Sequence, residues 1–146
     1  MPRTIHLLAL ITIWGLIGTA CGDADDGIFI DEPWARATAT AQNTAAVYFT
    51  VSATEADTLT GVFVSSEVAA SAALHETSMD DAGAMMMSMV QSVDVPGGGE
   101  VVFAPGGFHV MLADIVAPLR DGATFEMTLV FAQAGNVTVE VEVRDQ

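Results

Sequence analysis

Histidine and methionine side chains come close together at two places in this 146-residue sequence. His109 and Met111 lie two residues apart in the segment 108–112, which we predict to be a β-strand, so both side chains should emerge on one face. His75 precedes five methionines that fall within eleven residues: Met79, Met85, Met86, Met87 and Met89. Thioether sulfur suits a soft ion such as Cu(I), and imidazole nitrogen binds copper in either oxidation state. Together the two groups predict a Cu(I) site of two histidines and neighbouring methionines.

The methionine cluster also has interpretations that need no metal. Methionine fills irregular gaps in protein cores and forms adaptable apolar contact surfaces, and a histidine in a strand is commonly a hydrogen-bonded structural residue. Residues 80–83 (Asp-Asp-Ala-Gly) predict a turn, which would place the methionines in a loop rather than in a core strand. This placement favours the metal site. A metal-free scaffold lipoprotein with an adhesive methionine loop remains an alternative.

Several other chemistries lack the residues that they require. A blue-copper electron carrier needs a cysteine thiolate beside its histidines, but the one cysteine of the chain, Cys21, lies far from both in the sequence. Residues 75–79 (His-Glu-Thr-Ser-Met) lack the second histidine of a zinc-protease helix, and no glycine-rich phosphate-binding loop is evident. We therefore expect a binding protein rather than an enzyme.

The N-terminal segment has the order of an export signal. Arg3 precedes an uncharged run of 14 residues that ends in Gly-Thr-Ala immediately before Cys21, and a membrane-spanning helix would need about 20 apolar residues. We predict that residues 1–20 are a lipoprotein-type signal peptide and that Cys21 becomes a lipidated first residue. Residues 21–27 would then be a tether, and residues 28–146 the copper-binding domain of a periplasmic, membrane-anchored protein.

Acidic residues dominate the charge of the predicted exported part. Removal of the signal peptide would delete Arg3 and leave three arginines, no lysine and 19 carboxylates, which gives a net formal charge of −16. A field of this sign repels nucleic acid and attracts cations. We expect no nucleic-acid partner, and we interpret most of the carboxylates as groups that solvate the surface.

Short apolar runs separated by turn residues predict the fold. The expected strands are 28–30, 45–52, 58–65, 72–77, 87–93, 100–103, 108–112, 124–131 and 137–143. In the last of these, valines alternate with polar residues, as in a strand with one buried face. Glycine-rich turns between the runs are typical of antiparallel connections. This pattern predicts a single all-β domain, an antiparallel sandwich with Greek-key connections.

The spacing of the candidate ligands resembles that of the periplasmic copper chaperones of the PCu(A)C (PCuAC) family. Their pattern is a histidine, about ten residues, a methionine, 21 residues, and then histidine, any residue, methionine. Here His75 is followed by eleven residues, Met87, 21 residues and the segment 109–111 (His-Val-Met). Four further segments match the family: 33–37 (PWARA), 45–48 (AAVY), 74–77 (LHET) and 118–122 (PLRDG). The resemblance covers nearly all of residues 28–143.

The longer first gap leaves the methionine ligand before His109 open. Met86 would restore the first gap but spoil the second, and Met85 is a neighbouring alternative. We prefer Met87, because the stretch from it to His109 then needs no insertion. Met79 and Met89 are further alternates.

The resemblance implies a fold and a role that the residues alone do not. It implies a cupredoxin-like sandwich that carries Cu(I) in the periplasm to the binuclear copper centre of a haem-copper oxidase. The partners would be an oxidase subunit or a thioredoxin-like assembly factor. Binding of Cu(II) stays open. A copper-buffering or resistance lipoprotein without specific delivery is the alternative.

Overall fold

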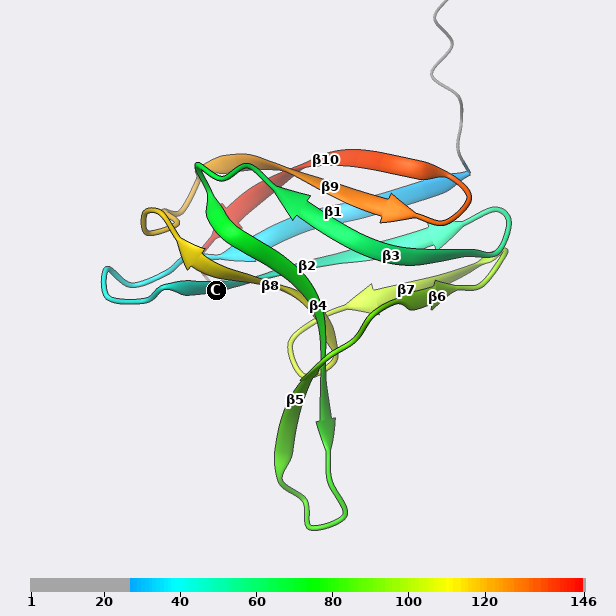
Figure 1. Ribbon diagram of the computed structural model, residues 1–146, viewed down its shortest axis with the longest axis horizontal. Helices are drawn as coiled ribbons and strands as arrows, with labels where there is room; N and C mark the ends of the chain where they lie inside the picture. Colours follow the sequence, from blue (N-terminus) through cyan, green and yellow to red (C-terminus); the bar gives the residue numbers. More distant parts are fainter. Residues whose placement is uncertain (1–26, 146) are drawn as a thin grey trace, which may run out of the picture.

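The computed structural model describes residues 27–145, which form an all-β structure (Figure 1). Its strands are β1 (Ile28–Arg36), β2 (Thr44–Ala53), β3 (Asp57–Val64), β4 (Ala69–Met79), β5 (Met85–Met89), β6 (Val93–Val95), β7 (Gly99–Phe103), β8 (Phe108–Ile115), β9 (Thr124–Phe131) and β10 (Gly135–Arg144). The predicted signal peptide and Cys21 lie outside the described residues. Within residues 27–145, no helix has the length and apolar character needed to cross a membrane. The predicted all-β fold class is confirmed.

The strands form one sheet that folds over into two layers (Figure 1). Hydrogen-bonded neighbours follow the order β5-β4-β8-β7-β2-β1-β10-β9-β3-β6, with an additional pairing of β8 with β2. In Figure 1, β1, β10, β9 and β3 lie over β2, β8 and β7. Most pairs are antiparallel, as predicted, but β1 pairs with β10 and β7 pairs with β8 in parallel. The site described below lies on the layer that contains β2, β8 and β4.

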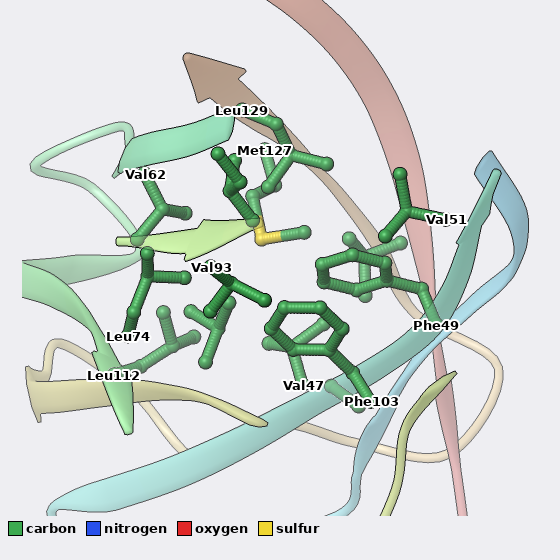
Figure 2. Close-up of a cluster of buried hydrophobic side chains, with 14 of the residues drawn as sticks. Val47, Phe49, Val51, Val62, Leu74, Val93, Phe103, Leu112, Met127 and Leu129 are labelled. Carbon is green, nitrogen blue, oxygen red and sulfur yellow. The ribbon is translucent and has the colours of Figure 1, made fainter. Parts of the chain in front are cut away.

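Side chains from both layers meet in one hydrophobic core (Figure 2). Phe49 of β2 stacks on Phe103 of β7, with ring centroids 4.3 Å apart. Met127 and Leu129 of β9 enter the same core from the other layer and are fully buried. Burial of each such side chain stabilises the fold by about 1.5–3 kcal/mol. Successive side chains of a strand point to opposite faces of the sheet, so the residues next to these core residues in the sequence point outward.

The side chain of Asp57 connects the start of β3 to the turn between β9 and β10 by hydrogen bonds. Its carboxylate accepts backbone hydrogen bonds from Thr58 at 2.7 Å and from Gln133 and Ala134 at 2.9 Å each. Burial of the carboxyl group raises its pKa, but these hydrogen bonds outweigh burial, and the net pKa of Asp57 is lowered. The charged form of this buried carboxylate is therefore the one that the fold stabilises.

The methionine segment differs from its prediction in two ways. The outer part of β4 and β5 form a two-stranded hairpin that projects from the sandwich (Figure 1), and we call residues 75–89 the arm. The expected methionine loop is thus wrong, because only residues 80–84 form the turn, where the Asp80 carboxylate accepts the N–H groups of Ala82 and Ala84 at 2.9 and 2.8 Å.

The expected continuous strand over residues 87–93 is also wrong. β5 ends at Met89, and the chain then leaves the arm at Val90, whose N–H donates to the Leu74 carbonyl at 2.9 Å. β6 begins at Val93, which is buried and pairs with Leu59 of β3. The segment 87–93 therefore belongs to two strands: its first part pairs with β4 and its last residue with β3, at opposite ends of the strand order.

Candidate metal site

His75 and His109 lie side by side on the outer face of the sheet. They are directly opposite each other in the antiparallel pairing of β4 with β8, and their ring centroids are 5.8 Å apart. Their neighbours Leu74 and Val110 are buried in the core, so strand alternation turns both imidazoles to the other face. His109 is 3% exposed, and His75 is half-buried. Strand pairing thus brings the two predicted histidines together.

A backbone hydrogen bond fixes the ring of His109. Its Nδ1 lies 3.1 Å from the carbonyl oxygen of Gly107, and because a carbonyl can only accept, Nδ1–H is the donor. The lone pair of the neutral ring is then on Nε2, which is buried and has no hydrogen-bond partner within residues 27–145. Metal-binding histidines commonly donate their other ring N–H to a carbonyl in this way. The ring of His109 is therefore oriented to bind a cation through Nε2.

His75 carries a second unsatisfied nitrogen. Its Nδ1 is buried and lacks a hydrogen-bond partner in the described part of the chain. Burial, and secondly the neighbouring His109, lower the pKa of His75 below its ordinary value, so the ring is neutral at neutral pH. A buried nitrogen without a partner costs about 1–3 kcal/mol. A cation bound to both rings would give each of the two buried nitrogens a partner and so remove this cost for both.

Met111 lies on the same face as the two histidines. It follows His109 by two residues in β8 and is opposite Ala73 of β4, two residues before His75. Its side chain is half-buried. The prediction that His109 and Met111 share one face of a strand is therefore confirmed by their register.

The register of β4 with β5 sorts the clustered methionines onto two faces. The opposite pairs are His75 with Met89, Thr77 with Met87, Ser78 with Met86 and Met79 with Met85. Directly opposite residues project to the same side of a sheet, and alternate residues of a strand share a side. Four methionines thus lie on the face of His75: Met79, Met85, Met87 and Met89. Met86 lies on the opposite face.

Two methionines of β5 come within side-chain reach of His75. Directly opposite residues have Cβ atoms about 4.5–5.5 Å apart, which applies to Met89, and diagonal neighbours about 7–8 Å apart, which applies to Met87. Met87 and Met111 lie on opposite sides of the row that joins His75 and His109. The register therefore places Met89 nearer to the histidines than the sequence-preferred Met87.

Tyr48 and Trp34 form an aromatic wall that we did not predict as part of the site. Tyr48 projects from β2 on the outer face, 9% exposed, with its ring centroid 6.4 Å from that of His109. Trp34 of β1 lies against it at 4.8 Å. Burial raises the pKa of the Tyr48 hydroxyl, and the charge of Arg36 partly opposes this rise. The wall shields one side of the histidine pair from water. Alternation along the expected strand 45–52 could have placed Tyr48 outward, but not beside His109.

The surroundings of the histidines contain sulfur and aromatic groups rather than clustered carboxylates. Among residues 27–145, no group of three or more histidine, cysteine, aspartate or glutamate side chains converges in a metal-binding arrangement. Glu76 follows His75, so it lies on the other face of β4. Imidazole and thioether ligands together suit a soft monovalent ion.

Comparison with known proteins gives concordant results. A family model described as "Putative lipoprotein LpqE-like" matches residues 28–143. The protein named "Putative lipoprotein Lxx21020", from Leifsonia xyli subsp. xyli, is 30% identical over 99% of this chain and 94% of its own length. A solved copper-bound PCuAC domain from PmoF2 is 34% identical, covers 82% of this chain and 94% of that domain, and superposes with a TM-score of 0.66. The solution structure of CuI-DR1885 from Deinococcus radiodurans is 26% identical, with coverages of 80% and 79% and a TM-score of 0.58.

Proposed function

Because this chain belongs to the LpqE-like lipoprotein family and has the PCuAC domain fold, we propose that it binds Cu(I) and carries it to an acceptor protein. The observation that carries the proposal is a pair of buried imidazole nitrogens, one on His75 and one on His109, on a face lined with methionine. Neither nitrogen has a hydrogen-bond partner among residues 27–145. Two structural relatives are described as copper-bound or CuI-containing, which supports copper as the ion.

We propose His75, His109 and Met111 as three of the ligands. The fourth is a methionine of β5: the spacing favours Met87, and the register favours Met89. The body of the sheet holds His109 and Met111, whereas the β5 methionines stand on the projecting arm. The ion would therefore join a rigid half-site on β8 to a more exposed half-site on the arm.

This division of the ligands suits a carrier that must release its cargo. The arm methionines are more than half exposed, at 53% for Met87 and 69% for Met89, so thioethers of an acceptor can approach them. Exchange can proceed one sulfur at a time while the Gly107 carbonyl keeps the His109 ring in place. Release then requires no unfolding of the sandwich.

The cellular role that we propose is delivery in the periplasm. The exported protein would be held at a membrane by acylated Cys21, and the relative from Leifsonia xyli named as a lipoprotein supports an anchored protein. We propose the binuclear copper centre of a haem-copper oxidase, served directly or through a thioredoxin-like factor, as the destination. Incubation of the copper-loaded protein with an apo copper domain of such an oxidase tests this step. Transfer at stoichiometric amounts supports delivery, and retention of the ion would favour copper buffering.

Cu(I) binding itself is tested by anaerobic competition against a colorimetric Cu(I) chelator. The wild type should withdraw copper from the chelator, and His109→Ala should lose at least tenfold in affinity, which corresponds to about 1.4 kcal/mol. Met86→Leu is a matched control, because Met86 lies on the opposite face of the arm. Equal affinities of His109→Ala and the wild type would contradict histidine ligation.

A further inference from the structure

The arm carries more sulfur on the histidine face than one ion can use. Four methionines lie on this face, while the histidine site needs one of them beside Met111. We propose that the outer part of the arm is a second, all-thioether site for Cu(I), formed by Met79, Met85 and Met87, with Met89 left to the histidine site. This site does not depend on the delivery role or on the histidines, because it needs only the register of the arm.

Three successive rows of side chains connect the two sites. The innermost row joins His75 to Met89, the next contains Met87, and the outermost joins Met79 to Met85. Rows on one face of a strand are about 6.6–6.8 Å apart, twice the rise per residue. A flexible thioether in the middle row can reach toward either neighbour, so an ion could pass outward while it stays bound to sulfur.

The outermost pair has the geometry of a cross-strand clip. Met79 and Met85 are directly opposite each other, which places their Cβ atoms about 4.5–5.5 Å apart. Both strands end at this pair, and a two-stranded hairpin is only marginally stable by itself. An ion held by one sulfur from each strand would cross-link the end of the arm and so favour the paired conformation.

The methionines of the proposed second site do not serve to fill the hydrophobic core, because their side chains are exposed. Met79 is 67% exposed, Met85 63% and Met87 53%, whereas Met127 is fully buried in the sandwich. Exposed apolar side chains gathered on one face commonly mark a binding site. Thioether sulfur is polarizable and soft, so the ligand class that matches this surface is a soft monovalent cation.

The charge of the arm also favours a cation. Residues 75–89 contain Glu76, Asp80 and Asp81 but no arginine or lysine. The two aspartates lie in the turn beside the outermost methionine pair. Neutral thioethers leave the charge of Cu(I) uncompensated, and nearby carboxylates lessen this cost without being ligands themselves.

Counting bound ions tests the second site. Cu(I) would be titrated anaerobically into the wild type, His75→Ala/His109→Ala and Met79→Leu/Met85→Leu, with methionine methyl NMR signals recorded alongside. We expect two ions for the wild type and one for each double variant. In the histidine variant the remaining ion should shift the methyl signals of Met79 and Met85. In the methionine variant the remaining ion should keep the wild-type affinity of the histidine site.

Met86→Leu provides the matched control, since Met86 is 56% exposed on the same arm but faces the other way. This variant should still bind two ions. The second site is overturned if His75→Ala/His109→Ala binds no ion, if Met79→Leu/Met85→Leu binds as many ions as the wild type, or if Met86→Leu binds one ion fewer than the wild type. These failures differ from failure of the proposed function, in which replacing the histidines leaves the tightest binding step unchanged. Circular dichroism of each variant establishes that the sandwich is folded.

Discussion

Replacing His109 by leucine tests whether the fold keeps its imidazoles unsatisfied in order to bind an ion. His109 is 3% exposed and its buried Nε2 has no partner among the described residues, so the metal-free protein carries a cost of about 1–3 kcal/mol. Leucine is similar in size and removes that nitrogen. It also removes the hydrogen bond to Gly107, a loss of about 0.5–1.5 kcal/mol. The Gly107 carbonyl still accepts the N–H of Thr77 at 3.0 Å, so no new unsatisfied group is created.

The balance of these effects predicts that His109→Leu raises the stability of the metal-free protein by about 1 kcal/mol. Urea denaturation at neutral pH, with a chelator present, measures the change. Cu(I) should reverse the order of stabilities: the wild type gains about 2.7 kcal/mol when free Cu(I) is 100 times the Kd, and the variant gains little. Met111→Leu keeps both rings and should change the metal-free stability by less than about 1.5 kcal/mol.

A destabilised metal-free His109→Leu protein would refute this reasoning. A loss of more than about 1 kcal/mol would mean that Nε2 is satisfied in solution and that His109 is an ordinary structural histidine. The measurement with Cu(I) would then decide only whether His109 also binds metal.

Three further predictions concern acid, the fold and the anchor. Because protons compete with the ion for imidazole and not for thioether, Cu(I) affinity should be constant above about pH 7 and fall below about pH 6, and unchanged affinity at pH 4 would reject ligation by His75 and His109. Asp57→Ala should destabilise the fold by about 3–5 kcal/mol in urea denaturation, because three backbone N–H groups lose a charged acceptor, whereas Asp94→Ala, an exposed control, should cost less than about 1 kcal/mol. The lowered pKa of Asp57 means that its contribution is complete above about pH 5 and lost as the pH falls through the folded-state pKa, so a pH-independent difference between wild type and Asp57→Ala would contradict this role. Cys21→Ser should move the protein from the membrane to the soluble fraction, and an unchanged distribution would exclude the lipid anchor.

The faces of individual strands could be predicted from the sequence, because alternation is a local property. His109 and Met111 were expected on one face, and the core positions of Val110 and Leu112 between and beside them produce that result. The all-β class and the PCu(A)C resemblance are likewise confirmed. Both depend on short-range patterns and on spacing.

The neighbours of each strand could not be predicted in this way, because pairing is decided by distant segments. The segment expected as one strand over residues 87–93 splits, since Met89 pairs with His75 while Val93 pairs with Leu59. The same limit hid Tyr48, whose place beside His109 follows from the pairing of β2 with β8. It also left the preference for Met87 over Met85 and Met86 to depend on spacing alone, and only the register places Met86 on the other face.

X-ray absorption spectroscopy of the protein loaded with one equivalent of Cu(I) tests the central claim most directly. We predict a Cu(I) edge and a first shell of two nitrogen and two sulfur scatterers, with one nitrogen lost in His109→Ala. A shell without sulfur, or a spectrum that does not change in His109→Ala, would contradict a site built from imidazole and thioether ligands.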